Sequence, residues 1–447
     1  MKKVLILLLL MPIAVFTHAQ QKWSLEKCIR YALDNNIQLK QQSLQLKNAE
    51  ITVQQDKFAL VPNLNAGASH GYNWGKNFSI YSQSLVNDQS YSDNFHMSSS
   101  VNIFDGFQKL NKLKQSRVDL EANKKDIEKS QNDISLNIAT AYLQILFYTE
   151  ALKVSENQLS STDLQIERIK KLVNVGNVAQ GELYNIQAQR ANEHSQVVET
   201  KNNLDLAYLT LSQMLDLPTK EGFEIETPEI SKLNPALLAI NTENVFATAL
   251  EKQPQIKSSE LKIKSAEYAV KQAQGTAYPS LSLQGSLGTT FSSAAKLPPA
   301  YDKTKPFADQ IKDNFNKSLS LSLSIPIFNG FSSRSGIARA KLNVENARLA
   351  HELNKNQLRK TIQQSYADAK AAFNKYEASQ TGIEATREAL RYAEGKYSVG
   401  VLNSVDYNNA KINNQKAESS YLQAKYDFLF KNMVLDFYMG QPLKLNY

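Results

Sequence analysis

The two halves of this 447-residue chain repeat one another, and this duplication restricts its possible folds more than any other feature. From about residue 32 to residue 64, residues recur 217 positions later (the first offset), and from residue 103 onwards they recur 224 positions later (the second offset). Matched pairs include Ala32/Ala249, Gln38/Gln255, Pro62/Pro279, Leu64/Leu281, Phe104/Phe328, Gly176/Gly400 and Pro218/Pro442. Each half is expected to run helix, strand, loop, strand, very long helix, turn and helix. A doubled unit of this kind has to be interpreted as an architecture before any residue is interpreted as a site.

The N-terminus predicts export from the cytoplasm. Residues 1–3 are Met-Lys-Lys, residues 4–16 are apolar, and Thr17-His18-Ala19 occupies the cleavage positions. This pattern is typical of a secretory signal peptide over residues 1–19, and it is too short to cross a bilayer as a helix. No later stretch reaches about 18 apolar residues, so no membrane-spanning helix is expected.

Cysteine content and charge exclude two further classes of protein. Cys28 is the single cysteine, so the fold cannot depend on an internal disulfide. The formal net charge of +8 falls to +6 once Lys2 and Lys3 are removed, and basic residues are interleaved with Glu and Asp. We interpret this as a solvated helical surface, with no nucleic-acid partner.

Four segments alternate apolar and small polar residues, as strands with one apolar face do. They lie at about 64–75, 94–104, 281–292 and 317–328, at matched places in the two halves. Each has about the ten residues that a tilted strand needs to cross a bilayer. A soluble sandwich with one wet face is the alternative, but four matched strands in an exported chain favour the membrane.

Four strands cannot close a barrel by themselves. Open strand edges are not tolerated in lipid, and the smallest membrane barrels have about eight strands. Several copies of the chain must therefore combine if the strands insert. Three copies supply about twelve strands, while the strand pattern alone leaves two or four copies open.

Two stretches without proline predict very long helices, at about 107–172 and 331–396. A helix of about 65 residues is about 100 Å long, which exceeds the needs of a compact soluble domain. Each helix carries an apolar stripe at spacings of three, four and seven, which packs against neighbouring helices. The stripes are Ile134, Ile138, Tyr142, Ile145 and Leu152, and Leu358, Ile362, Tyr366, Ala369 and Tyr376.

The long helices are expected to turn back on themselves. Gly176 and Gly400 lie just past them, where a positive φ is expected, and return helices follow at about 180–215 and 402–438. The chain thus divides into a first repeat at 20–218, a linker at 219–243 and a second repeat at 244–447. Polar segments at about 76–93 and 293–315 are expected to be exposed loops.

Two motifs give the chain a resemblance to a known family. Ile103-Phe104-Asp105-Gly106-Phe107 and Ile325-Pro326-Ile327-Phe328-Asn329-Gly330-Phe331 fall where a strand becomes a long helix. Tyr397-Ser-Val-Gly400-Val-Leu-Asn-Ser-Val-Asp406 is the turn of the second hairpin, and 173–182 is its first-half counterpart. Both resemble signatures of the TolC family of outer-membrane efflux and secretion channels. Asn329 replaces the more usual Asp, and Phe107 and Phe331 replace a second Gly.

This resemblance implies a mainly α-helical protein with a membrane β-barrel. It implies a homotrimer in the outer membrane of a Gram-negative bacterium, with a barrel of about twelve strands continued by a periplasmic α-helical tunnel. It also implies docking onto a periplasmic adaptor protein and an inner-membrane pump. The pump can be of the RND type or the ABC type. The cargo has no signature in the sequence.

The resemblance further implies a gate at the periplasmic entrance. Asp406 matches the first acidic ring of the family, whereas Asn409 stands at the second. Glu182 and Asn185 lie at the first hairpin and Tyr397 at the second, and a Glu182–Tyr397 hydrogen bond is expected to lock the closed state. Leu402 replaces the family's constraining Arg. The alternative is that Asp406 and Glu182 only cap their helices, because acids are favoured in a first turn.

No pattern for catalysis, metal binding or a cofactor is present. The histidines of the mature chain lack His, Cys or acidic neighbours at metal-ligand spacing, and there is no Gly-rich phosphate loop or nucleophile elbow. They are His70, His96, His194 and His351. A passive export duct is therefore expected rather than an enzyme. A periplasmic coiled-coil adaptor or structural protein is the alternative, although it predicts one helical hairpin and not two.

Overall fold

The computed structural model describes residues 22–79, 83–217, 223–228, 241–297, 303–441 and 443. The expected signal peptide, most of the expected linker, Pro218, Pro442 and residues 298–302 of the expected loop at 293–315 lie outside these residues. The chain forms two compact units. The helical unit comprises Met1–Gln42, Glu128–Gln253 and Asn356–Tyr447, and the sheet unit comprises Ser43–Ile127 and Pro254–Lys355.

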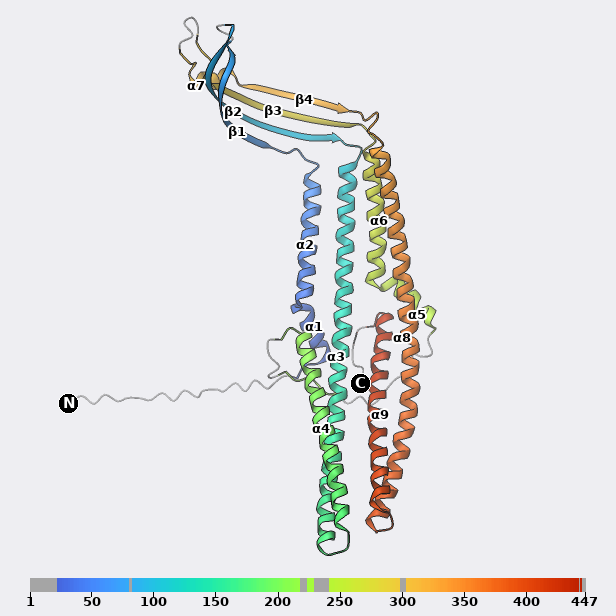
Figure 1. The fold of residues 1–447 in the computed structure, drawn as a ribbon. Coiled ribbons are helices and arrows are strands. Elements are labelled where there is room, and N and C mark those ends of the chain that lie inside the picture. The colour runs from blue at the N-terminus through green and yellow to red at the C-terminus, as the bar shows by residue number, and fades with distance from the viewer. Residues whose placement is uncertain are drawn as a thin grey trace, which may run out of the picture. The chain divides into compact units, whose positions relative to one another are not determined.

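The helices repeat at the two offsets found in the sequence. The first repeat contains α1 (Leu25–Asn35), α2 (Ile37–Phe58), α3 (Gln108–Asn174) and α4 (Gln180–Met214), and the second contains α5 (Thr242–Lys252), α6 (Pro254–Gly275), α8 (Ser332–Ser398) and α9 (Ser404–Tyr438). The shorter helices recur at the first offset, and the hairpin helices recur at the second. Figure 1 shows α4 returning along α3 and α9 returning along α8. The tandem architecture is confirmed.

The opening helix of each repeat is divided in two, which the sequence pattern did not indicate. In the first repeat, Asn36 leaves the helical conformation with φ −57° and ψ 126°, and its Oδ1 accepts a hydrogen bond from Leu39 N at 3.2 Å. In the second repeat, Gln253 is extended and Pro254 begins α6. A residue before proline is driven out of the helical region, whereas proline suits a first helical position.

The strands form one antiparallel sheet in the order β1-β2-β3-β4. Their bounds are β1 (Asn65–Ser79), β2 (Ser84–Phe104), β3 (Ser280–Ser292) and β4 (Asn316–Ser324). The expectation of a loop over 76–93 is wrong, because β1 and β2 continue as a hairpin until Ser79 pairs with Ser84. Backbone pairing maintains this hairpin although its residues do not alternate in polarity.

Two further expectations about the strands need correction. β4 ends at Ser324, four residues before the expected end, because Pro326 has no N–H to donate to a strand ladder. The segment 293–315 was expected to be a loop, but it contains helix α7 (Phe307–Asp313). The buried Gln310 side chain fastens α7 to the end of β3, since it accepts from Ser292 N and donates to Ser292 O, both at 2.9 Å.

The apolar face of the sheet is exposed along β4, whereas Phe307 of α7 packs on Phe291 and Phe95 of the same face further along the sheet. Leu319, Leu321 and Leu323 of β4 are 77%, 62% and 60% exposed. On the opposite face the residues are small and polar, and Ser286 Oγ lies 2.6 Å from Ser318 Oγ. The alternation expected from the sequence is therefore present in the second-repeat strands.

The core of the helical unit is built around α3. Ile138, Tyr142 and Ile145 of its apolar stripe are at most 1% exposed. The Tyr142 hydroxyl donates to the Glu226 carbonyl at 2.8 Å, and Ile225 forms a parallel bridge with Trp23. The described part of the linker thus packs on the first long helix. None of the described helices combines the length and hydropathy needed to cross a membrane.

Candidate functional site

Each helical hairpin turns at a glycine in the left-handed conformation. Gly176 has φ +80° and Gly400 has φ +79°. Past the end of α3, Gly176 N donates to Val173 O at 3.0 Å, and past the end of α8, Gly400 N donates to Tyr397 O at 3.2 Å. These bonds use carbonyls that a helix end leaves free, and the positive φ that they require is favourable for glycine.

Asp406 lies in the first turn of α9 and is exposed to solvent. Asn403 is the N-cap of this helix, and its Oδ1 accepts from Asp406 N at 2.8 Å while its Nδ2 donates to Asp406 Oδ2 at 2.9 Å. The Asn403 side chain thus caps the helix, the Asp406 carboxylate orients that side chain, and a negative charge at this position also suits the helix dipole. Asn409, one turn further along α9, is exposed, and Leu402 precedes the helix. Asp406 therefore takes part in the N-terminal cap of α9.

Tyr397 does not form the hydrogen bond that was expected with Glu182, although both residues are described. Its ring stacks on Tyr407 of α9 instead, with 4.6 Å between centroids and an interplanar angle of 7°. Burial, and secondarily the charge of Glu182, raises the pKa of Tyr397. Glu182 is in the first turn of α4, and Asn185 is exposed beyond it. The contact within α8–α9 has replaced the expected contact between hairpins.

Two other hydrogen bonds join the hairpins near their turns. Arg168 Nη2 of α3 donates to the carbonyl of Ser398 at 3.0 Å. One turn away, Gln165 Nε2 donates to Tyr407 Oη at 2.5 Å. Burial, with the nearby charge of Glu394, raises the pKa of Tyr407 to about 12, so this hydroxyl stays protonated at neutral pH.

A buried polar cluster, which we call the clasp, also joins the two hairpins. It consists of Thr162 on α3, Glu193 on α4 and Lys411 on α9, which are 0%, 6% and 3% exposed. Lys411 Nζ lies 3.5 Å from Glu193 Oε1 and also donates to Thr162 Oγ1, which in turn donates to Glu193. Gln158 and Gln189 donate to the same Glu193 oxygen at 3.2 and 3.0 Å. Every clasp member thus has a polar partner, as buried charges require.

Sequence reasoning missed the clasp, although a signal was present. Ile186, Glu193, Thr200 and Ala207 follow one another at heptad spacing on α4, and all are buried. A glutamate at a seam position indicates a buried partner on a neighbouring helix. Burial lowers the pKa of Lys411, and the charge of Glu193 opposes this shift. The clasp therefore balances a desolvation cost against an ion pair.

The two strand-to-helix corners have the same backbone conformation. Gly106 and Phe107 have φ +67° and +63°, and Gly330 and Phe331 have φ +61° and +65°. The residue before each pair faces the start of the long helix. Asp105 Oδ2 accepts from Lys109 N at 3.0 Å, and Asn329 Nδ2 donates to Ser333 Oγ at 2.6 Å. Phe104 packs edge-on against Phe107, with ring centroids 5.2 Å apart. Pro326 and Phe328 lie in the segment between β4 and α8.

His70 and His351 each lie within hydrogen-bonding distance of a polar side chain. His70 Nδ1 lies 2.6 Å from Asp93 Oδ1, on the neighbouring strand of the sheet, and His351 Nδ1 lies 2.8 Å from Ser259 Oγ. Among the residues that the structure describes, no group of three or more His, Cys, Asp or Glu could hold a metal ion.

Comparison with known proteins agrees with this architecture. The sequence model described as "Outer membrane efflux protein" matches residues 28–216 and 245–441. Outer membrane protein TolC of Escherichia coli K12 is 23% identical over 448 residues, covering 98% of this chain and 87% of that protein. The CmeC outer membrane channel of Campylobacter jejuni has a TM-score of 0.77 at 19% identity, covering 94% of this chain and 87% of that one.

A second solved structure extends the match. The outer membrane protein VceC of Vibrio cholerae has a TM-score of 0.76 at 14% identity, covering 94% of this chain and 96% of that chain. The chain therefore has the fold of these outer-membrane proteins.

Proposed function

Because the chain belongs to the outer membrane efflux protein family, we propose that it is the passive export duct of a transport complex. It is an outer-membrane protein of the efflux and secretion class. A duct performs no catalytic step, and it needs neither a cofactor nor a metal. The energy for transport comes from an inner-membrane pump.

The observation that carries this proposal is the open sheet. β1 and β4 are its two edges, and the apolar side chains Leu319, Leu321 and Leu323 of its outer strand are exposed. Lipid suits these side chains, but hydrocarbon does not tolerate unpaired strand edges. Copies of the chain therefore pair edge to edge. Three copies supply about twelve strands, within the range of membrane barrels, and six helical hairpins that line a tunnel in the periplasm.

The entrance of the duct lies at the hairpin turns. In a trimer, Asp406 recurs three times about the symmetry axis and forms one carboxylate ring, because Asn409 carries no charge. Like charges close to an axis attract cations into a narrow pore. Within each subunit, the clasp, Gln165 and Arg168 join the two hairpins near the proposed entrance. Opening requires these contacts to change.

The partners of the duct are a periplasmic adaptor protein and an inner-membrane pump. The helical hairpins provide the surface for the adaptor, since coiled-coil partners bind helical faces. A pump of the RND type and one of the ABC type would both be served by the same passive duct.

Fractionation followed by conductance measurement tests the proposal. The chain should appear in outer membranes as trimers that survive unheated SDS, and these trimers should form cation-preferring pores in planar bilayers. Boiling the sample provides the monomer reference on the same gel. Recovery of soluble periplasmic monomers without pore activity would reject the duct and support a coiled-coil adaptor.

A further inference from the structure

The two open edges of the sheet are related by the internal repeat. β1 is the first strand of repeat one, and β4 is the second strand of repeat two. β2 and β3, the second strand of repeat one and the first of repeat two, pair in the middle of the sheet. The β2–β3 junction inside one chain is thus a template for a β4–β1 junction between two chains.

We propose that a second copy of the chain pairs its β1 with β4 in the register of this template and places its Phe58 against the corner between β4 and α8. This inference rests on the proposed function, because it specifies the subunit contact of the proposed trimer. It goes beyond that function by naming which residues meet.

The repeat holds inside the sheet residue by residue. Ala66 pairs with Met97 in the first hairpin, and Leu283 pairs with Leu321 in the second. Leu283 is the counterpart of Ala66 at the first offset, and Leu321 is the counterpart of Met97 at the second. Both hairpins therefore have the same register, and the two offsets can be applied to the junction between them.

The template assigns the register between copies. Ser99 of β2 pairs with Gly285 of β3. Moving forward from Ser99 by the second offset gives Leu323, and moving back from Gly285 by the first offset gives Ala68. Leu323 of one copy therefore faces Ala68 of the next. The other pairs of this ladder follow in antiparallel order.

The side-chain faces agree with this register. Leu323 shares a sheet face with its pairing partner Leu281, and Ala68 shares that same face with its partner Phe95. Pairing Leu323 with Ala68 continues this apolar face from one copy to the next. A slip by one residue would turn the apolar side chains of β4 toward the polar face.

The template also contains a close backbone contact at its helical end. A Cβ added to Gly106, at the β2–α3 corner, would lie 2.3 Å from the carbonyl oxygen of Gly275 at the end of α6. A Cβ added to Gly275 would lie 2.4 Å from Cγ of Gln108 and 2.6 Å from the carbonyl oxygen of Gly106. Only glycine fits on either side of this contact.

The equivalent contact between copies cannot keep this backbone approach, because Phe58 stands in the place of Gly275 and its Cβ would meet the Gly330 carbonyl oxygen. The end of α2 must therefore lie further from the β4–α8 corner than the end of α6 lies from the β2–α3 corner, which leaves space for the Phe58 ring. Gly106 corresponds to Gly330, which has nothing within 4 Å of an added Cβ, so this position is open in the single chain. Gly275 corresponds to Phe58, whose side chain is 66% exposed at the end of α2. Gln108 corresponds to the smaller Ser332. Ser332 and Gly330 leave space at this corner for the Phe58 ring once the backbones stand further apart.

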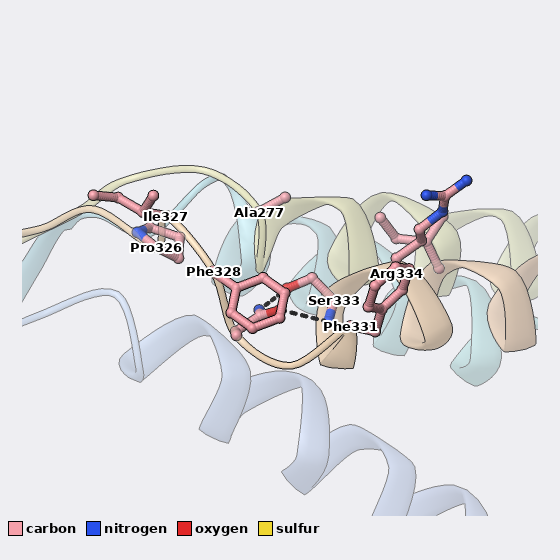
Figure 2. Close-up of a pocket in the computed structure, with 9 residues that line it drawn as sticks. Ala277, Pro326, Ile327, Phe328, Phe331, Ser333 and Arg334 are labelled. Atoms are coloured by element: carbon pink, nitrogen blue, oxygen red, sulfur yellow. Dashed lines mark hydrogen bonds between the residues drawn. The ribbon is translucent and has the colours of Figure 1, made fainter.

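A cavity provides room for the Phe58 ring at this corner. It has a volume of about 330 Å³, and Figure 2 shows its lining along the turn that joins β4 to α8. The lining residues include Pro326, Ile327, Phe328, Phe331 and Arg334. Aromatic and aliphatic walls suit an aromatic side chain.

The helices that follow the two corners carry matching apolar stripes. On α2, Leu44, Ile51 and Phe58 lie at heptad spacing and are 62%, 60% and 66% exposed. On the first half of α8, Leu342 and Leu349 lie at the same spacing and are 69% and 62% exposed. Inside one chain, α6 packs on α3, where Ser258 donates to Asp126 at 2.6 Å. The template accordingly packs α2 of the second copy on α8.

Disulfide cross-linking tests the register. Cys28→Ala removes the single cysteine, and two pairs are then introduced, Ala68→Cys with Leu323→Cys on the apolar face and Ser69→Cys with Ser322→Cys on the polar face. Oxidation of outer membranes by copper phenanthroline should link at least one pair into covalent dimers and trimers. Both faces are needed because opposed residues alternate between closer and wider spacing.

Shifted pairs are the controls for this experiment. Ala66→Cys with Leu323→Cys and Gly71→Cys with Ser322→Cys each move the register by two residues, so their Cβ atoms lie too far apart for a disulfide. Non-covalent trimers that cross-link only through a shifted pair would overturn the register and leave the duct intact. Absence of any trimer before oxidation would instead contradict the proposed function.

A second variant tests the corner contact. Phe58→Ala should lower the temperature at which the trimer dissociates in SDS, because the ring leaves its site between copies. Phe78→Ala is the matched control, since this phenylalanine is 64% exposed but lies beyond the residues of β1 that face β4. Equal dissociation temperatures for Phe58→Ala and Phe78→Ala would overturn the placement of Phe58.

Discussion

Phe107 and Phe331 have backbone conformations that L-amino acids adopt at a cost. Their φ values are +63° and +65°, and each follows a glycine that is also left-handed. The left-handed region costs a non-glycine residue about 1–2 kcal/mol because Cβ approaches the backbone carbonyl. Phe107 gains a compensating edge-on contact with Phe104. The family resemblance places a second glycine at this position, which has no such cost.

Replacing Phe107 separates backbone strain from ring packing. Phe107→Gly and Phe107→Ala both lose the ring, but only the alanine variant keeps the strained backbone. The glycine variant should therefore be more stable by about 1 kcal/mol, as measured by denaturant unfolding in detergent. Phe104→Gly and Phe104→Ala are the control, where φ is not positive and alanine should be the more stable. The same order at both positions would contradict the strain.

Charge at the proposed entrance can be removed or added by isosteric substitution. Asp406→Asn keeps an acceptor for Asn403 but removes three charges from the trimer, so block by a multivalent cation should weaken by roughly tenfold or more. Asn409→Asp should strengthen the block, because it adds a second ring. Single-channel recordings with the cation on the entrance side provide the measurement. Unchanged cation block in both variants would contradict the placement of Asp406 and Asn409 at the entrance.

The clasp acts at the scale of whole helices. It joins α9 to the α3–α4 hairpin through Lys411, Thr162 and Glu193. The other buried residues at heptad spacing on α4, which are Ile186, Thr200 and Ala207, are apolar or small. Buried ion pairs contribute little net stability, but removing one partner leaves an uncompensated charge. The clasp is therefore expected to determine how the hairpins fit together more than how stable they are.

A double-mutant cycle measures this property. Lys411→Met alone should destabilise the helical unit by about 3–5 kcal/mol, because Glu193 remains buried without its cation. Lys411→Met combined with Glu193→Leu should recover most of that loss. Urea unfolding followed by circular dichroism gives the four values of the cycle. Additive losses in the double variant would show that the two residues do not interact.

At the scale of the whole molecule, the two faces of the sheet have different surroundings. Leu321 is on the apolar face and Ser322 on the polar one, and both are exposed in the single chain. In a trimeric barrel, these faces contact lipid and water respectively. Neighbouring residues on one strand therefore report on opposite environments.

Lysine substitutions at these two positions provide a matched pair. Leu321→Lys should cost about 2–4 kcal/mol per subunit near the bilayer centre, and should reduce the amount of heat-resistant trimer in outer membranes. Ser322→Lys should assemble normally and alter only conductance. If both variants assembled to the same extent, the lipid-facing assignment of β4 would be untenable.

Some features of the candidate site could be predicted from the sequence, and others depended on packing. Gly176 and Gly400 were expected to have positive φ, because a helix that reverses needs a left-handed residue. Tyr397 was expected to bond to Glu182 but stacks on Tyr407. The hydrogen-bond partner of a tyrosine depends on the relative rotation of packed helices, which no local pattern specifies.

The sequence by itself determined the repeat, the long helices and the alternation of β3 and β4, because periodicity and backbone sterics act over a few residues. Only the tertiary structure decided that β1 and β2 extend into a long hairpin, that α7 is fastened to β3 by Gln310, and that Lys411 meets Thr162 from a distant part of the chain. These contacts form between segments that are not neighbours in sequence. Their partners are selected by packing and by the need to satisfy buried polar groups.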